Sequence, residues 1–228
     1  GLWVHSGVGI IGGAPKSAKS WLALEMGVAV ASATPCLGRF PVEKAGSVLL
    51  YAAEDAPSIV RSRLEGLASH RGLKLEALPI QVITAESLRL DVEEDQNRLK
   101  RTVEALRPAL LILDPFVRLH HIDENSAGEV SRILAYLRSL QRAFDLAVAL
   151  VHHARKNGSA TSPGQSLRGS TDFHAWGDTN LYMHRRGTDL ILTIEHRCAP
   201  APDPLVLQLC NQDPEAVHLK SLDHPSEI

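Results

Sequence analysis

Apolar runs of strand length alternate along most of this chain with longer segments in which apolar residues recur at helical spacing. The runs predict strands at residues 8–12, 48–53, 80–84, 110–114 and 146–152. The longer segments predict helices at residues 18–32, 57–70, 93–106 and 126–143. Almost uninterrupted apolar strands that alternate with helices are typical of parallel sheets covered on both faces. We therefore expect an α/β fold with a central, mainly parallel, twisted sheet flanked by helices.

The pattern changes near residue 180, where short apolar segments follow one another without helices between them. These segments cover residues 181–184, 190–196, 205–209 and 216–222, and turns rich in glycine or proline separate them. Short strands joined by such turns are typical of antiparallel hairpins. We therefore expect a hairpin region over residues 180–222 that extends one edge of the sheet, within a single domain of residues 1–228.

Composition and charge limit the classes of function. The 228 residues carry a net charge of −2 and a sequence pI near 6.6, so any contact with nucleic acid has to come from a local loop. The three cysteines, Cys36, Cys198 and Cys210, are far apart in sequence, which argues against a zinc motif and a disulfide framework. The apolar runs are of strand length, and the first residues lack the pattern of a signal peptide. These features predict a cytoplasmic protein without a membrane partner.

One turn has the pattern of a phosphate-binding loop. The first predicted strand is joined to the first predicted helix by Gly13-Ala14-Pro15-Lys16-Ser17-Ala18-Lys19-Ser20. Backbone N–H groups of such a loop, together with the N-terminus of the following helix, bind the phosphates of a nucleotide. In this interpretation Lys19 contacts the terminal phosphates and the Ser20 hydroxyl binds Mg²⁺. The alternative is a Gly/Pro turn before an ordinary amphipathic helix.

Ala18 departs from the pattern G-x-x-x-x-G-K-[ST], which has glycine at this position. If the position requires a positive φ, alanine costs about 1–2 kcal/mol relative to glycine. A cost of this size is tolerable. We therefore expect all eight residues, 13–20, to contribute to nucleotide binding.

Two further predicted strands end in carboxylates, Asp114 on one strand and Glu54-Asp55 on the other. Ligands of an open parallel sheet bind beyond the carboxyl ends of its strands, so these side chains should lie beside the phosphate loop. Asp114 is expected to hold Mg²⁺, or alternatively to begin a turn with Pro115. Glu54 is expected to deprotonate the attacking water as general base, and Asp55 to cap the following helix.

A pair of histidines, His152-His153, ends the fifth predicted strand. A polar residue at this position can contact the γ-phosphate of ATP and transmit its loss to the following loop. Adjacent residues on a strand point to opposite faces, so the pair is a weak zinc site. We expect one histidine of the pair to be structural.

In their order along the chain, these motifs resemble those of the RepA-type branch of the RecA-like P-loop ATPases, which includes hexameric replicative helicases. The matching segments are residues 13–20, Tyr51-Ala52-Ala53-Glu54-Asp55 with Arg63-Leu64, Leu113-Asp114-Pro115 with Arg118-Leu119-His120 and Asp123-Glu124-Asn125, Val151-His152-His153-Ala154, and Arg168-Gly169-Ser170. The resemblance implies a RecA fold, ATP hydrolysis with Mg²⁺, assembly into a ring, and single-stranded DNA in the central channel.

The resemblance also implies roles for individual residues. Lys19 and Ser20 correspond to the nucleotide and metal residues, and Asp114 to the metal-coordinating acid. Glu54 corresponds to the catalytic base. Between the two histidines, His153 is the candidate for the γ-phosphate sensor.

The chain differs from its helicase relatives near Asp178, where they carry an arginine on the subunit interface. We therefore expect a different arginine to complete the site of the neighbouring subunit. Arg197, which ends a predicted strand in the hairpin region, is the candidate, and Arg168 is the alternative. An ordinary surface charge is the other interpretation of either arginine.

The segment 156–168 is rich in Gly, Ser, Thr and Pro and is expected to be mobile. It supplies Lys156 and Arg168, with Arg155 next to it. These cations suit contact with the nucleic-acid backbone without base recognition, because the segment has no aromatic side chain on which a base could stack. A solvated surface loop is the alternative.

The sequence therefore predicts an ATP-hydrolysing motor subunit that acts on single-stranded DNA, either helicase-like or an ATPase of replication or mobile elements, in a homo-oligomeric ring that is expected to be hexameric. A second hypothesis is an ATP-bound loader or scaffold with weak or no hydrolysis. A third is a signalling ATPase with a RecA fold, for which the sequence has no recognisable element.

Overall fold

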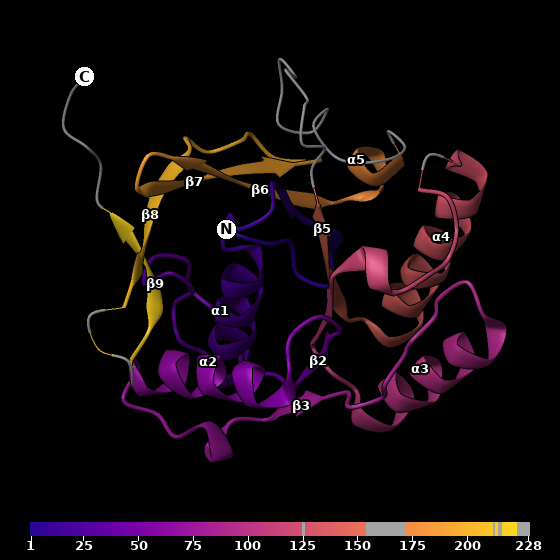
Figure 1. The fold of residues 1–228 in the computed structure, drawn as a ribbon, viewed down its shortest axis with the longest axis horizontal. Coiled ribbons are helices and arrows are strands. Elements are labelled where there is room, and N and C mark those ends of the chain that lie inside the picture. The colour runs from indigo at the N-terminus through magenta and orange to yellow at the C-terminus, as the bar shows by residue number, and fades with distance from the viewer. Residues whose placement is uncertain (125, 154–171, 212, 214–215, 223–228) are drawn as a thin grey trace.

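A sheet of nine strands runs through the part of the chain that the computed structural model describes, residues 1–124, 126–153, 172–211, 213 and 216–222 (Figure 1). The strands are β1 (Val8–Gly13), β2 (Val48–Ala52), β3 (Ile80–Val82), β4 (Leu110–Asp114), β5 (Ala147–His153), β6 (Thr179–Arg186), β7 (Asp189–His196), β8 (Leu205–Cys210) and β9 (His218–Leu222). Their order is β3-β2-β4-β5-β1-β6-β7-β8-β9. Neighbouring strands are parallel from β3 to β6 and antiparallel from β6 to β9. The predicted mainly parallel sheet with an antiparallel extension is confirmed.

Helices cover both faces of the parallel strands. They are α1 (Lys19–Ser32), α2 (Pro57–Ser69), α3 (Glu93–Leu106), α4 (Ala127–Phe144) and the short α5 (Asp172–Trp176), with two 3₁₀ turns, η1 (Leu75–Ala77) and η2 (Phe116–Arg118). The core on one face joins α1 and α2 to the sheet, and the core on the other face joins α3, α4 and α5 to it. The four predicted helices and five predicted parallel strands all occur, with ends within two residues of the expected ones. No helix among the described residues is long and apolar enough to span a membrane.

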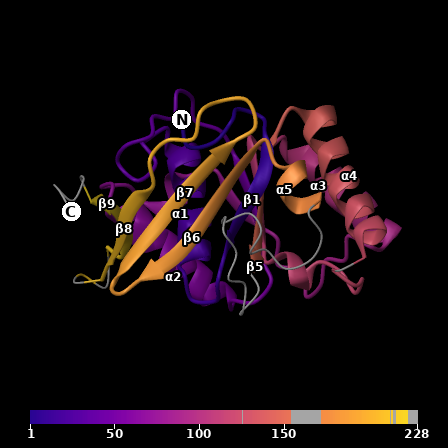
Figure 2. The ribbon, with the colours of Figure 1, turned by 90° about the horizontal axis from the view of Figure 1, so that it is seen from above.

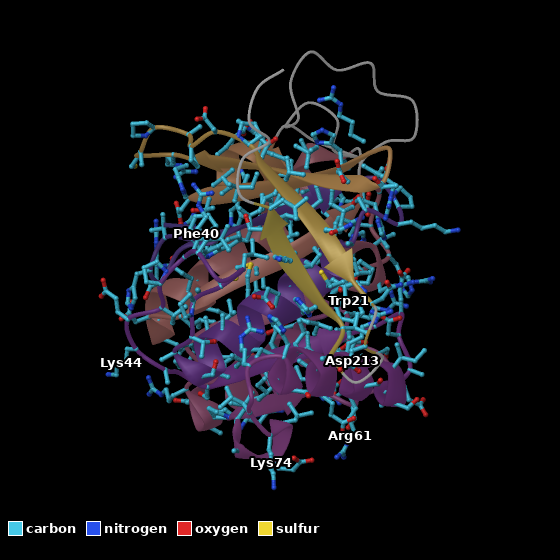
Figure 3. All side chains as sticks on the ribbon, turned by 90° about the vertical axis from the view of Figure 1, so that its left-hand side faces the viewer. Trp21, Phe40, Lys44, Arg61, Lys74 and Asp213 are labelled. Carbon is cyan, nitrogen blue, oxygen red and sulfur yellow. The ribbon has the colours of Figure 1, made fainter. Side chains whose placement is uncertain are left out.

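The antiparallel strands curl around α1 and enclose it (Figure 1). Seen from above, β6 and β7 pass over α1, and the side view shows β8 and β9 lying over the same helix (Figures 2 and 3). Ten of the fourteen residues of α1 are buried, and its sequence is apolar on nearly all sides, as expected for a helix without a solvent-facing stripe. On β7, alternate residues such as Leu192 and Ile194 are buried in the core that contains α1. The helix that follows the phosphate loop is therefore held from several directions.

A buried ion pair anchors α1 to the end of α2. Arg71 donates a hydrogen bond to the carboxylate of Glu25, which also accepts one from the backbone N–H of Leu37 at 2.8 Å. The same guanidinium donates to Thr34 Oγ1 and to the carbonyl of Leu67, both at 2.9 Å. Breaking such a pair leaves an uncompensated buried charge, so the network specifies how α1 and α2 pack.

The structure adds a pairing to the strand that begins the hairpin region, β6. The predicted hairpin of this segment with residues 190–196 is confirmed, because β6 pairs with β7 in antiparallel fashion. The other edge of β6 pairs with β1 in parallel, which the sequence pattern did not indicate. Glycines on β1 permit the close approach, because a Cβ added to Gly9 would lie 1.6 Å from the Thr179 carbonyl oxygen, and one added to Gly13 would lie 2.1 Å from that of Met183. A parallel pair needs a crossover connection, and α5 lies in the connection between β5 and β6. As a result, the carboxyl end of β6 lies at the same edge of the sheet as that of β1.

Candidate active site

A pocket lies at the carboxyl edge of the parallel strands, at the N-terminus of α1. Its walls come from the phosphate loop, α1, α2, the ends of β2, β4, β5 and β6, and β8. The lining residues are Lys16, Ala18, Lys19, Ser20, Trp21, Ala52, Glu54, Asp55, Arg63, Asp114, His153, Arg185 and Leu209. Five side chains for which the sequence predicted catalytic or metal-binding roles therefore share one pocket, namely Lys19, Ser20, Glu54, Asp114 and His153.

The turn between β1 and α1 has the backbone conformation of an anion-binding nest. Lys16 and Ala18 have left-handed φ values of 63° and 62°, and Ser17 between them has a negative φ. Alternation of this kind directs successive N–H groups toward one point. The Ser17 hydroxyl donates to the Ala14 carbonyl at 2.8 Å, which closes the turn. The loop conformation fits a phosphate group.

Lys19 is buried in the pocket with a perturbed charge. Its Nζ donates to the Ala14 carbonyl at 2.7 Å. Burial lowers the pKa of Lys19 to about 8, although the carboxylates of Asp114 and Glu54 oppose the shift. The ammonium group is therefore incompletely compensated and would be stabilised by an anion such as a phosphate.

Asp114, the last residue of β4, has a pKa that is shifted in the opposite direction from that of Lys19. Burial raises its pKa to about 6, and repulsion from Asp55 and Glu54 adds to the effect, whereas a hydrogen bond from Ser20 and the charge of Lys19 oppose it. Hydroxyl and carboxylate oxygens are ligands that Mg²⁺ prefers, together with nucleotide phosphates and water. Ser20 and Asp114 lie together in the pocket, so this pair fits a magnesium ion.

Glu54 and Asp55 follow β2, and each pairs with an arginine. Glu54 Oε1 accepts a hydrogen bond from Arg118 Nε at 3.0 Å. Both oxygens of Asp55 accept from Arg63, at 2.6 and 3.3 Å. The expectation that Asp55 caps α2 is wrong, because the cap residue is Ala56 and no side chain caps it. The pair with Arg63, on a later turn of the same helix, takes the Asp55 carboxylate instead.

The two histidines at the end of β5 point to different environments. His152 is buried, and its ring stacks on Phe173 with centroids 4.4 Å apart and meets the edge of Phe116 at 5.6 Å. His153 lines the pocket. This arrangement follows from the alternation of side chains along a strand. It makes His152 the histidine of the apolar core and places His153 beside the phosphate loop.

Arg197 lies at the opposite edge of the sheet from the pocket. It follows β7, whose end pairs with the start of β6. Its Nη1 lies 3.6 Å from Asp178 Oδ1, and its Nη2 donates to the Ala175 carbonyl. Its expected contact with a neighbouring subunit stays a prediction. The predicted nucleic-acid residues Lys156 and Arg168 lie outside the described residues.

The sequence interpretation missed two side chains of the pocket, Arg185 and Trp21. Arg185 is the second-last residue of β6, and its Nη2 lies 3.5 Å from the Lys16 carbonyl oxygen in the phosphate loop. The Arg185-Arg186 pair is visible in the sequence, but nothing local to it indicates that β6 lies beside β1. Trp21 follows Ser20, and the guanidinium of Arg63 lies 5.5 Å from the centroid of its ring.

Together, the sheet order and the loop between β1 and α1 place this protein in the class of RecA-like P-loop ATPase folds, with carboxylates at the ends of β2 and β4. Residues 1–159 match the family model described as an AAA domain. The chain belongs to this AAA domain family.

Solved structures with the same fold include a RadB recombinase, 17% identical, with a TM-score of 0.69 over 97% of this chain and 93% of the recombinase. A DnaB-like replicative helicase, solved with regard to its interactions with primase, is 14% identical and has a TM-score of 0.71. That match covers 97% of this chain and 58% of the helicase. A KaiC-like protein from the hyperthermophilic archaeon Pyrococcus horikoshii OT3 is 12% identical, with a TM-score of 0.62 over 95% of this chain and 90% of that protein. At these identities the similarity establishes the fold.

Asp114→Asn is expected to stabilise the protein without nucleotide. The pKa of Asp114 is about 6 in the folded state and ordinarily 3.8, so the folded state binds the proton more tightly and loses stability as the pH rises between these values. At pH 7.5 the substitution should raise the free energy of unfolding by about 1–3 kcal/mol, and the gain should shrink toward pH 4. Urea denaturation of the variant and the wild type at pH 7.5 and at about pH 4 measures the difference in the free energy of unfolding. Asp203→Asn, at an exposed position, is the control, and a destabilised Asp114→Asn at pH 7.5 would contradict the expectation.

Ala18→Gly is expected to stabilise the phosphate loop, because Ala18 occupies the left-handed region. Ala33, at the other end of α1, has a similar φ of 53° and provides a matched control. Each glycine should raise the free energy of unfolding by about 1 kcal/mol. Only Ala18→Gly should change the affinity for ATP, measured by titration calorimetry. Equal ATP affinities in the two variants would show that Ala18 does not influence the nucleotide.

Proposed function

We propose that this protein is a Mg²⁺-dependent ATPase that acts as a motor subunit on single-stranded nucleic acid. The observation that supports ATP hydrolysis most directly is the shared pocket of Lys19, Ser20, Glu54, Asp114 and His153. These residues come from α1 and from the ends of β2, β4 and β5, far apart in sequence. Phosphoryl transfer to water requires a cation, two oxygen ligands for a metal and a separate carboxylate, and the pocket contains all of them.

Each residue has a definite task in this mechanism. Lys19 exchanges its hydrogen bond with the Ala14 carbonyl for one with a terminal phosphate oxygen. Ser20 and Asp114 hold Mg²⁺, which neutralises phosphate charge when bound. Glu54 orients the attacking water and accepts its proton. His153 contacts the γ-phosphate, so the loss of that phosphate removes a contact at the end of β5.

The positions of the pocket and Arg197 favour assembly into a ring. The pocket lies at the carboxyl edge of the sheet and Arg197 at the opposite edge. Subunits that associate head to tail join two different surfaces and close into a ring when the rotation permits. In such a ring Arg197 reaches the pocket of its neighbour and stabilises the charge that develops on the phosphate. We propose a homo-oligomeric ring, with a hexamer as the expected form.

The nucleic-acid substrate is inferred from the relatives and from the position of the predicted basic segment. Two of the similar structures are a recombinase and a replicative helicase. Residues 156–168, with Lys156 and Arg168, begin three positions after His153 in sequence. We propose that the γ-phosphate state, sensed by His153, repositions this segment along a single strand.

The conformation of Ala18 favours a second candidate function. An alanine held at φ 62° costs free energy that a glycine would not, so the loop is less favourable than the consensus loop. A protein with slow turnover would act as an ATP-bound loader or scaffold for a replication or transposition partner. Tight ATP binding with negligible hydrolysis, in the presence of single-stranded DNA and of the oligomer, would support this candidate over the motor.

Glu54→Gln is the test of the proposed ATPase. The variant keeps a hydrogen-bonding side chain of the same size but cannot accept the proton of water, so kcat should fall about 100-fold or more while ATP still binds. Phosphate release with Mg²⁺ and ATP, with and without an oligo(dT) strand, measures the basal rate and its stimulation. Glu76→Gln, at an exposed position outside the pocket, should behave like the wild type. Unchanged hydrolysis in Glu54→Gln would remove Glu54 as the base.

Mixing two inactive variants tests the proposed action of Arg197 on a neighbour. Arg197→Ala should lose about 10³-fold in kcat, because transition-state charge goes uncompensated. When Arg197→Ala is mixed with Glu54→Gln, a ring contains some interfaces with an intact Glu54 on one side and an intact Arg197 on the other, so activity should return. Arg142→Ala, an exposed position on α4, is the control. Failure of the mixture to recover activity would exclude action between subunits.

A further inference from the structure

An ion pair links the proposed catalytic base to the loop that follows the metal-binding strand. Strands β2 and β4 are neighbours, and Ala52 lies opposite Asp114 in their register. The backbone N–H of Ala53 donates to the Asp114 carbonyl at 2.7 Å, which continues the pairing past the end of β2. The chain then brings Glu54 and Arg118 together, with Arg118 Nε 3.0 Å from Glu54 Oε1.

The backbone that carries Arg118 is fixed, whereas its side chain faces solvent. Phe116 and Leu119 are fully buried on either side of it, and the N–H of Leu90 donates to the Leu119 carbonyl. Arg89 Nη1 donates to the Arg118 carbonyl at 3.2 Å. By contrast, the Arg118 side chain is 61% exposed and that of Glu54 is 43% exposed. The guanidinium is therefore presented from a rigid turn to any anion that approaches this edge of the sheet.

An exposed pair of this kind is easily exchanged for another. Its measured contribution elsewhere corresponds to a factor of about two to five in an equilibrium, because solvent screens it. A guanidinium has five donors and matches the geometry of a phosphate group with two parallel hydrogen bonds. Glu54 accepts a hydrogen bond from Arg118 Nε. A phosphodiester group can accept two hydrogen bonds from the same guanidinium, so it competes effectively with Glu54 for Arg118.

We propose that Arg118 is a positioning residue that holds the Glu54 carboxylate while no nucleic acid is bound, and that a phosphodiester backbone, by binding Arg118, frees Glu54 to act on water. This inference rests on the proposed role of Glu54 as the base. It supplies a direct physical link between the strand and hydrolysis, since the residue that binds the phosphodiester is the one that restrains the base.

The position of the turn favours nucleic acid as the anion. η2 packs against β5, whose last residue, His153, lines the pocket. Arg89 contributes a second cation at the same turn, because its guanidinium bonds the carbonyls of Arg118 and His120. Two neighbouring cations on a rigid surface suit the regular spacing of charge along a phosphodiester strand.

Arg118→Gln tests the proposal through hydrolysis. With the restraint removed, basal kcat should rise about two- to fivefold with the KM for ATP unchanged, and the stimulation by oligo(dT) should fall by a similar factor. The salt dependence of oligo(dT) binding should lose about one unit of slope, as expected for one phosphate contact. Arg118→Lys, which keeps the charge, should restore most of the stimulation. Arg98→Gln removes another exposed guanidinium, paired with Asp95 away from the pocket, and should leave every value unchanged.

A double-mutant cycle separates this role from a structural one. In the Glu54→Gln background, Arg118→Gln should change neither the residual rate nor its stimulation, because the partner it restrains is gone. A lower basal rate in Arg118→Gln, or full stimulation by oligo(dT) in that variant, would overturn the proposal while leaving the ATPase intact. A wild-type protein that does not hydrolyse ATP under any of these conditions would instead overturn the proposed function, and this inference with it.

Discussion

The burial of α1 on nearly all sides is the constraint on which the candidate site depends. The parallel strands support one side of this helix, and the curled extension from β7 to β9 covers the others. At the middle of the helix, the buried pair of Glu25 and Arg71 ties it to the end of α2. The N-terminus of α1 is consequently fixed relative to the strand ends. A loop that must direct several N–H groups toward one phosphate needs this rigidity, because small displacements weaken each contact.

The pocket contains buried charged groups that other protein groups do not fully compensate. Burial lowers the pKa of Lys19 and raises that of Asp114, so both groups are destabilised in their charged forms. Ala18 adds backbone strain at the same place. Perturbed groups that gather in one pocket are typical of sites that bind and transform a charged ligand. A nucleotide with its metal would supply both missing charges.

The opposite edge of the sheet contains a different cluster, centred on Asp178. Its carboxylate accepts hydrogen bonds from Arg138 at 2.5 Å and from the backbone N–H of Val8 at 3.0 Å, and it faces Arg197. Burial alone would raise the pKa of Asp178, but these hydrogen bonds and charges hold it below its ordinary value. The acidic residue that departs from the helicase pattern thus orients two arginines. In the proposed ring, this edge faces the pocket of the next subunit.

The sequence by itself determined the elements and the main chemical groups, because their signals are local. Apolar periodicity located α3 at residues 93–106 and β4 at 110–114, and a strand-turn-helix pattern located the phosphate loop. Only the tertiary structure decided the parallel pairing of β6 with β1, the partner of Asp55 and the approach of Arg185 and Arg118. These depend on contacts between segments far apart in the chain, such as the close packing of Gly9 and Gly13 against β6, which no local pattern encodes. The residue type fixes the chemistry that a side chain can perform, whereas the pairing of strands fixes which other groups it contacts.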